Sequence, residues 1–194
     1  MKKTFLLVLA STLLTGCLFS QGTGMTGGNG HSEAFYSELH DLTVDFSSDE
    51  WAFDLYPFYP GLEDYVLSIH LDATPYEGTN FGDAAFVLTS QEVDSLETCL
   101  SFVTTDERTS GFSEDSTVSF NGLSYYATTG SGAAAGSLYE SKYFRVYRDG
   151  RCFQAAEVLH TTAIGNYDFA VVTEVNVEEV WAKLDSVMET LKFE

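Results

Sequence analysis

The chain has 194 residues, of which 29 are acidic and only 9 are Lys or Arg, so its formal net charge is −20 at pH 7. Such a surface repels phosphate backbones and anionic lipid headgroups, which argues against nucleic acid as a partner. The length leaves room for one domain with a sizeable core even after a leader is removed.

The first residues have the layout of a secretory signal. Lys2 and Lys3 precede an apolar run over residues 5–14, shorter than the roughly 20 residues of a transmembrane helix. The run ends in Leu-Thr-Gly-Cys at residues 14–17, which resembles a bacterial lipobox. The resemblance implies that residues 1–16 are a signal peptide and that Cys17 becomes a diacylglyceryl cysteine with palmitate-like chains, which meets the need for two hydrophobic anchors. An uncleaved anchor helix is the alternative.

Localisation follows from this leader. We expect a lipid-anchored protein of the cell envelope, on the extracytoplasmic side of the membrane. Leu18 stands where some diderm bacteria read an aspartate as an inner-membrane retention signal, so its presence favours the outer membrane in a diderm cell. Residues 17–31 are rich in glycine and are expected to form a flexible tether with a reach of roughly 20 Å. Residues 32–194 are expected to form a single globular domain.

The first half of that domain is predicted to contain short elements. Residues 32–40 could form a short helix, and a second one could open at Thr89 and run to about Leu96. Four segments of β-branched and aromatic residues between them are predicted strands: 42–46, 51–56, 65–71 and 84–88.

An aromatic segment begins with the second of these strands and extends beyond it. Residues 51–60 hold five aromatic residues and two prolines, close to Glu63 and Asp64. Alternation assigns the first aromatic residues to the core face of a strand. Tyr56, Phe58 and Tyr59 either line the exit loop or form an exposed patch that stacks on a sugar or grips a peptide.

Two hairpins are predicted in the second half. Residues 138–148 and 151–161 are joined by Asp149-Gly150, and residues 117–120 and 123–126 by Asn121-Gly122. Both dipeptides suit a type I′ turn, which needs positive φ at its two central residues. Phe144 and Val146 should then share one face of their strand. The small residues at 130–136 are predicted to be a plain loop, because the lysine of a phosphate-binding loop is missing.

The last element is a predicted amphipathic helix. Asn176 can cap it, and Glu179 completes a box-like arrangement. Apolar residues recur at helical spacing along one stripe: Val177, Val180, Trp181, Leu184, Val187, Met188 and Leu191. The expected fold class is therefore α+β, a twisted antiparallel sheet packed by a long C-terminal helix and one or two short helices.

Only two cysteines remain after the lipobox, Cys99 and Cys152. An isolated pair in an exported protein usually forms a disulfide. A catalytic pairing of Cys152 with His160 is the alternative, and an oxidising compartment disfavours it.

The order of segments in the second half is familiar. It contains residues 121–125 (NGLSY), the loop at 130–136, then 143–148 (YFRVYR), 150–153 (GRCF), 160–162 (HTT), 164–167 (IGNY) and the final helix. This order, over about residues 90–194, resembles a group of uncharacterised bacterial lipoproteins, and more distantly the PsbP/Mog1-like α/β sandwich. The resemblance implies that fold, supports the Cys99–Cys152 pairing and implies an accessory binding role. It implies no reaction.

Catalytic motifs are missing from the sequence. It has no Gly-x-Ser-x-Gly, His-Glu-x-x-His or Cys-x-x-Cys pattern, and His40, His70 and His160 are far apart. His160, at the end of a predicted strand, is the best single polar candidate, either for binding or as a structural hydrogen-bonding residue. Acidic pairs have no diagnostic value among 29 acids, and no calcium loop is present.

The sequence therefore predicts a lipid-anchored, non-enzymatic accessory or binding module of the envelope, with no catalytic residue, no cofactor and no metal. Its expected partners are the membrane, through Cys17, and an unknown envelope protein or glycan. The alternative is an envelope hydrolase or carbohydrate-active enzyme that uses an acidic pair or His160.

Overall fold

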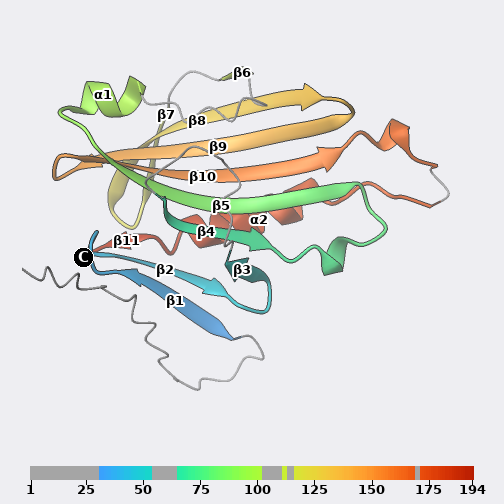
Figure 1. Ribbon diagram of the computed structural model, residues 1–194, viewed down its shortest axis with the longest axis horizontal. Coiled ribbons are helices and arrows are strands. Elements are labelled where there is room, and N and C mark those ends of the chain that lie inside the picture. The colour runs from blue at the N-terminus through green and yellow to red at the C-terminus, as the bar shows by residue number, and fades with distance from the viewer. Residues whose placement is uncertain (1–30, 54–64, 102–110, 113–115, 169–170) are drawn as a thin grey trace, which may run out of the picture.

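A computed structural model describes residues 31–53, 65–101, 111–112, 116–168 and 171–194. More than half of these residues lie in strands, which form a large sheet and a small one (Figure 1).

The large sheet has eight antiparallel strands in the order β3-β4-β5-β10-β9-β8-β6, with β7 also paired to β8. Their bounds are β3 Trp51–Phe53, β4 Tyr65–Leu71, β5 Phe81–Glu92, β6 Gly111–Phe112, β7 Ser116–Phe120, β8 Leu123–Ala134, β9 Ser137–Arg148 and β10 Arg151–Thr162. The small sheet has the order β1-β2-β11, with β1 Ser32–Ser37, β2 Leu42–Ser47 and β11 Lys192–Phe193.

Helical structure is sparse in the described part of the chain. There are two α-helices, α1 (Leu96–Ser101) and α2 (Val177–Met188), and two short 3₁₀ turns, η1 (Thr74–Tyr76) and η2 (Ile164–Asn166). α2 begins as predicted, because the Asn176 side chain accepts a hydrogen bond from the backbone N–H of Glu179.

The centre of the large sheet is built from consecutive hairpins. Asn121-Gly122 and Asp149-Gly150 both have positive φ at their two residues, which confirms the predicted type I′ turns. A third hairpin joins β8 to β9 through Ala135-Gly136, whose φ angles are 51° and 86°.

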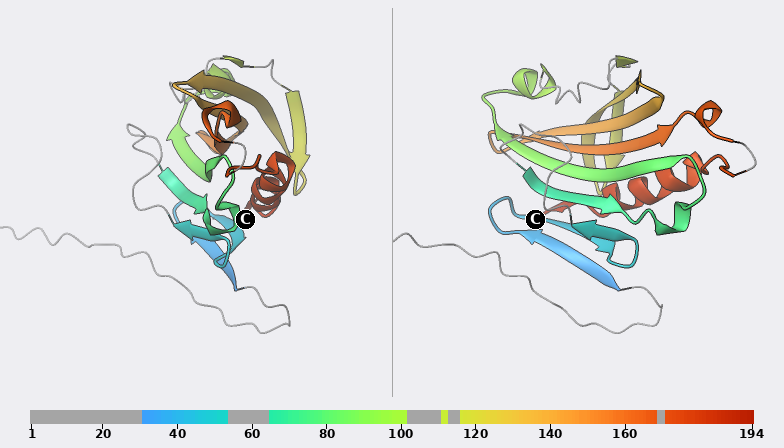
Figure 2. Two further views of the ribbon diagram at one scale, coloured as in Figure 1. Left: turned by 90° about the vertical axis from the view of Figure 1, so that its right-hand side faces the viewer. Right: turned by 45° about the vertical axis from the view of Figure 1, so that its right-hand side comes forward.

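The main hydrophobic core lies between the concave side of the large sheet, α2 and the small sheet. Figure 2 (left) shows the strands from β5 to β7 curving around the red helix α2. Each element contributes alternate or helically spaced apolar side chains to this core, including Val44 of β2, Phe86 of β5, Phe144 of β9 and Leu184 of α2. Burial of this area supplies the main driving force for the fold.

The expected fold class is wrong. The described part of the chain is mostly β, with two sheets and a single helix longer than α1, and that helix has only twelve residues. It is not the expected PsbP/Mog1-like α+β arrangement of one sheet packed by a long C-terminal helix. The physical reason is strand pairing: segments with weak helical or loop signals are recruited into long ladders.

Three segments show this recruitment. Residues 32–40 were predicted to be helical, but Ser32–Ser37 pairs with β2 along its whole length. The predicted helix at 89–96 is replaced by an extension of β5 to Glu92, which pairs with Arg151, and α1 begins only at Leu96. The small-residue segment 130–136 continues β8 to Ala134 and pairs with β9.

Candidate functional site

The most unusual residue of the described core is Glu157, in the middle of β10. Successive residues of this strand face opposite sides of the sheet, and Glu157 lies on the core side with Ala155 and Leu159. Its side chain is 0% exposed. In register on the β5 side lies the fully buried Phe86, so an acidic side chain occupies an otherwise apolar layer.

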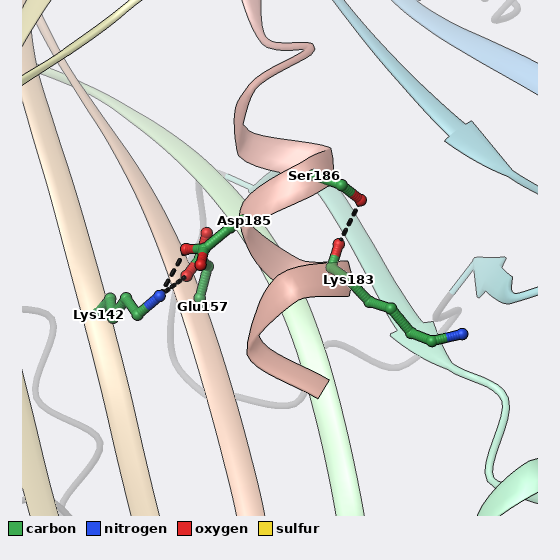
Figure 3. Close-up of polar contacts among 5 residues, drawn as sticks. All are labelled: Lys142, Glu157, Lys183, Asp185 and Ser186. Carbon is green, nitrogen blue, oxygen red and sulfur yellow. Dashed lines mark hydrogen bonds and ion pairs between the residues drawn. The ribbon is translucent and has the colours of Figure 1, made fainter. Parts of the chain in front are cut away.

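Two charged side chains reach Glu157. Lys142 lies directly opposite it on β9, and the Lys142 Nζ is 3.4 Å from the Glu157 Oε2. Asp185 comes from the sheet-facing side of α2, and its Oδ1 is 2.5 Å from the same Nζ. Figure 3 shows the ammonium reaching both carboxyl groups from the β9 strand. We call Lys142, Glu157 and Asp185 the acid–lysine cluster.

The cluster is closed on the sheet side and partly open at the helix. The Lys142 and Asp185 side chains are 28% and 42% exposed, whereas Glu157 has no exposed surface. The ring of Trp181, one helical turn before Asp185, lies under the ammonium at 4.5 Å from centroid to Nζ. This cation–π contact and the ion pair hold the lysine in place between the sheet and α2.

Burial controls the protonation of the cluster. Desolvation raises the pKa of Glu157 to about 8, against the lowering effect of Lys142 and with a further raising effect of Asp185. The neighbouring Asp185 carboxyl favours the protonated form of Glu157, because two adjacent carboxylates repel each other. At neutral pH the cluster therefore holds one lysine, one neutral acid and one partly exposed aspartate.

Glu157 and its partners were missed from sequence because acids are so abundant in this chain. A usable signal did exist. Once Asp149-Gly150 is taken as a two-residue turn, counting outward along both strands places Lys142 opposite Glu157. The strand around Glu157 is otherwise apolar, so an opposite-charge pair in its middle is informative. Asp185 could not be added without the packing of α2.

His160 lies on the other side of β10, away from the cluster. Its ring stacks on Tyr139 of β9 with centroids 4.7 Å apart and an interplanar angle of 11°. Gly82 on β5 makes room for it, because a Cβ there would lie 2.5 Å from the His160 Nδ1. The structure therefore places His160 within a packed ring stack and does not bring it near Glu157 or Asp185.

Cys152 lies on this same side and forms a disulfide with Cys99, with the two Cα atoms 5.2 Å apart. The pairing predicted from the sequence is thus present, and it fastens α1 to the sheet. Arg145, also on this face, donates to the Leu100 carbonyl at 2.5 Å and to the Thr128 hydroxyl. A disulfide and a buried cation therefore hold α1.

The other predicted site residues cannot be placed. Cys17, Tyr56, Phe58 and Tyr59 lie outside the described residues. In the described start of the aromatic segment, Trp51 is buried, while Phe53 is 37% exposed and packs edge-on against Phe46.

A cavity of about 470 Å³ lies at one end of the large sheet, beside the C-terminal end of β5 and the turn of the β9–β10 hairpin. Its walls are Glu92, Val93, Asp94, Asp149, Gly150 and Arg151, so it contains neither His160 nor the acid–lysine cluster. Within the described ranges, no three His, Cys, Asp or Glu side chains are placed to hold a metal ion. None of the helices seen in those ranges has the length and apolarity needed to cross a membrane.

No model of a known protein family and no curated protein matches this sequence. The solved structures that are similar include the following two, both at low identity. A Bacteroides thetaiotaomicron protein is 12% identical with a TM-score of 0.47, over 83% of this chain and 48% of its own, so this chain spans about half of it. LpqN, involved in cell envelope biogenesis of Mycobacterium tuberculosis, is 14% identical with a TM-score of 0.34, over 86% of each chain. With scores this low, the site is interpreted from its own geometry.

Proposed function

We propose that this chain is a lipid-anchored, extracytoplasmic binding module of the bacterial envelope that performs no turnover chemistry. The observation that carries the proposal is the N-terminal sequence: two lysines, an apolar run over residues 5–14 and a lipobox-like end at Cys17. Lipid on Cys17 would confine the domain to the membrane surface, and the glycine-rich residues that follow would give it reach.

The geometry of the acid–lysine cluster supports binding over hydrolysis. Cleavage of a glycosidic bond needs two carboxyl groups on opposite sides of the substrate, separated by roughly 5–9.5 Å of accessible space. Here the Lys142 ammonium contacts both acids, and Glu157 has no surface that a substrate could touch. The hydrolase hypothesis therefore finds no open acidic pair at this cluster, and His160 is packed against Tyr139.

The charge of the chain constrains the partner. With 29 acidic residues it should bind neutral glycans or basic polypeptide surfaces in preference to anionic polymers. We assign recognition to the aromatic segment with Tyr56, Phe58 and Tyr59, because aromatic residues close in sequence to carboxylates suit sugars and peptides alike.

The anchor is tested by Cys17→Ser in the full chain. We expect the wild type in the membrane fraction and labelled by a fatty-acid probe, whereas the variant should be unlabelled and soluble after export. Cys99→Ser, which keeps the lipobox intact, is the matched control. A variant that stays on the membrane would rule out lipidation as the anchor.

Recognition is tested with a photo-crosslinking amino acid placed singly at Tyr56, Phe58 and Tyr59 in intact cells. We expect a discrete adduct from at least one of these positions and none from Tyr167, an exposed tyrosine more than 100 residues away in the sequence. Release from the membrane by Cys17→Ser should abolish the adduct. Adducts of equal yield at all four positions would argue against a recognition segment at residues 56–59.

A further inference from the structure

The acid–lysine cluster brings an amine and a carboxyl group into contact from elements that are far apart in sequence. Lys142 on β9 and Asp185 on α2 are 43 residues apart, and their Nζ and Oδ1 atoms are 2.5 Å apart. Beside them lies Glu157, which is fully buried and 3.4 Å from the same Nζ. No other described ion pair combines these three features.

We propose that Lys142 and Asp185 form an intramolecular isopeptide bond, with Glu157 as the neighbouring group that transfers the protons. The product is an amide between the lysine Nζ and the aspartate Cγ. It would fasten α2 covalently to the large sheet in a single, self-catalysed event, and it requires no cofactor or added reactant.

The atoms of this step balance. The lysine ammonium passes one proton within the cluster and becomes a neutral amine, which attacks the Asp185 Cγ. The C–N bond forms, a C–O bond breaks, and the departing oxygen leaves as water. Glu157, which starts protonated, donates its proton to that oxygen and then takes one back from the nitrogen, so it ends unchanged and both hydrogens of the water derive, in the net balance, from the ammonium. The sum is one ammonium and one carboxylate giving one amide and one water.

Three properties of the site favour this reaction. First, the fold holds amine and carboxyl in contact, and such preorganisation corresponds to effective molarities of about 10⁵ M or more. Second, the raised pKa of Glu157 leaves it protonated at neutral pH, ready to donate to the oxygen that leaves. Third, Glu157 has no exposed surface and the Trp181 ring covers the ammonium at 4.5 Å, so the side of the cluster that faces the sheet is shielded from water.

The chain provides its own comparison. Lys183, on the same helix, forms an equally close ion pair with Glu50, and its side chain is labelled in Figure 3. Lys183 and Glu50 are 23% and 45% exposed, much like Lys142 and Asp185, yet within the described ranges no fully buried carboxyl accompanies them. If the third group is what matters, Lys142 will form an amide and Lys183 will not.

The test is peptide mapping of the full chain, purified from membranes, reduced, unfolded and digested with trypsin. We expect a branched peptide that contains Lys142 and Asp185 and is lighter by one water than its two linear parts, with no cleavage after Lys142. Mapping is needed because Asp149-Gly150 can also lose one water by forming a succinimide, which an intact mass would not distinguish. Two linear peptides from folded protein kept at pH 8 would overturn the proposal.

Variants separate the roles within the cluster. Lys142→Arg keeps the charge and removes the nucleophile, so it should yield linear peptides only. Glu157→Gln keeps the shape, and if it shows the wild-type circular dichroism it should form the amide at least about 100-fold more slowly. Amide formation at the wild-type rate in Glu157→Gln would overturn the role of Glu157. A branched peptide at Lys183 and Glu50 would show that proximity alone suffices, which also overturns that role.

Discussion

At the scale of single residues, the position of Glu157 is energetically unfavourable, because an acidic side chain lies in an apolar layer. Its neighbours on the core side of β10, Ala155 and Leu159, and its register partner Phe86 are what a sheet core requires. A carboxyl group among them is stable only when it is neutral or paired, because the desolvation of a charge in such a layer is costly. The raised pKa, which keeps the carboxyl neutral, and the contact with Lys142 each lower this desolvation cost.

This predicts how stability depends on pH. The pKa of Glu157 is about 8 in the folded chain and 4.5 when unperturbed, so its stabilising proton is fully effective below about pH 4.5 and is lost as pH rises through 8. Urea unfolding should show the wild type losing stability on the order of a few kcal/mol between pH 5 and pH 9 from this group. Glu157→Gln should lack that component, whether or not the amide forms.

The matched control for this pH series is Glu140→Gln, at an exposed acid on the adjacent strand β9. Its pH dependence should follow the wild type. Parallel curves for the wild type and Glu157→Gln would mean that the buried carboxyl is not protonated in the folded chain.

At the scale of elements, local signals predicted some pieces well. The Asn176 cap, the helical spacing from Val180 to Met188 and the two Gly-containing turns each depend on a few neighbouring residues, and each is present in the structure. The disulfide is a further success, because composition left Cys99 a single partner once Cys17 is set aside.

Elements that depend on a distant partner could not be predicted in this way. Ala135 takes a positive φ that alanine rarely adopts, so the β8–β9 turn carries only half of a turn signal. Ser32–Ser37 becomes a strand because β2 pairs with it, and the same residues alone favour a helix. The fold class and the contact between Asp185 and Lys142 could not be predicted from the sequence for the same reason, because both depend on how the sheets and α2 pack together.

The β8–β9 turn gives a prediction at this scale. Gly136→Ala and Gly122→Ala both force an alanine into positive φ, which costs about 1–2 kcal/mol. At Gly136 the new Cβ would also overlap the Asn166 side-chain amide, whereas at Gly122 it meets nothing within 4 Å. We therefore expect a larger loss of unfolding free energy for Gly136→Ala, measured by urea denaturation. Equal losses would show that the Asn166 contact adjusts without cost.

At the scale of the whole molecule, fastening occurs on both faces of the large sheet. The disulfide between Cys99 and Cys152 ties α1 to one face of β10, and the acid–lysine cluster ties α2 to the opposite face. Both faces are therefore held at the central strands β9 and β10, where the ladders are longest.

Removal of the disulfide should be costly. It closes a loop with a sequence separation of 53, for which the chain-entropy model gives about 4 kcal/mol. Cys99→Ser should unfold at correspondingly lower denaturant concentration, and a reducing agent should bring the wild type to the same midpoint. Cys17→Ser, with the disulfide intact, should keep the wild-type midpoint. Free thiols at Cys99 and Cys152 in protein from its own compartment would refute the bridge.

The small sheet carries a consequence for the order of folding. Its first two strands are made early, but its third strand is Lys192–Phe193, which pairs with Thr43 and Leu42. In a chain that emerges N-terminus first, the β1–β2 hairpin therefore lacks its third strand until almost all of the large sheet and α2 have been made. Such a high contact order slows folding and leaves the unfilled edge of β2 exposed to other chains during synthesis. The surplus of negative charge on the chain would then act as a kinetic safeguard, because growing chains of like charge repel one another before that edge is closed.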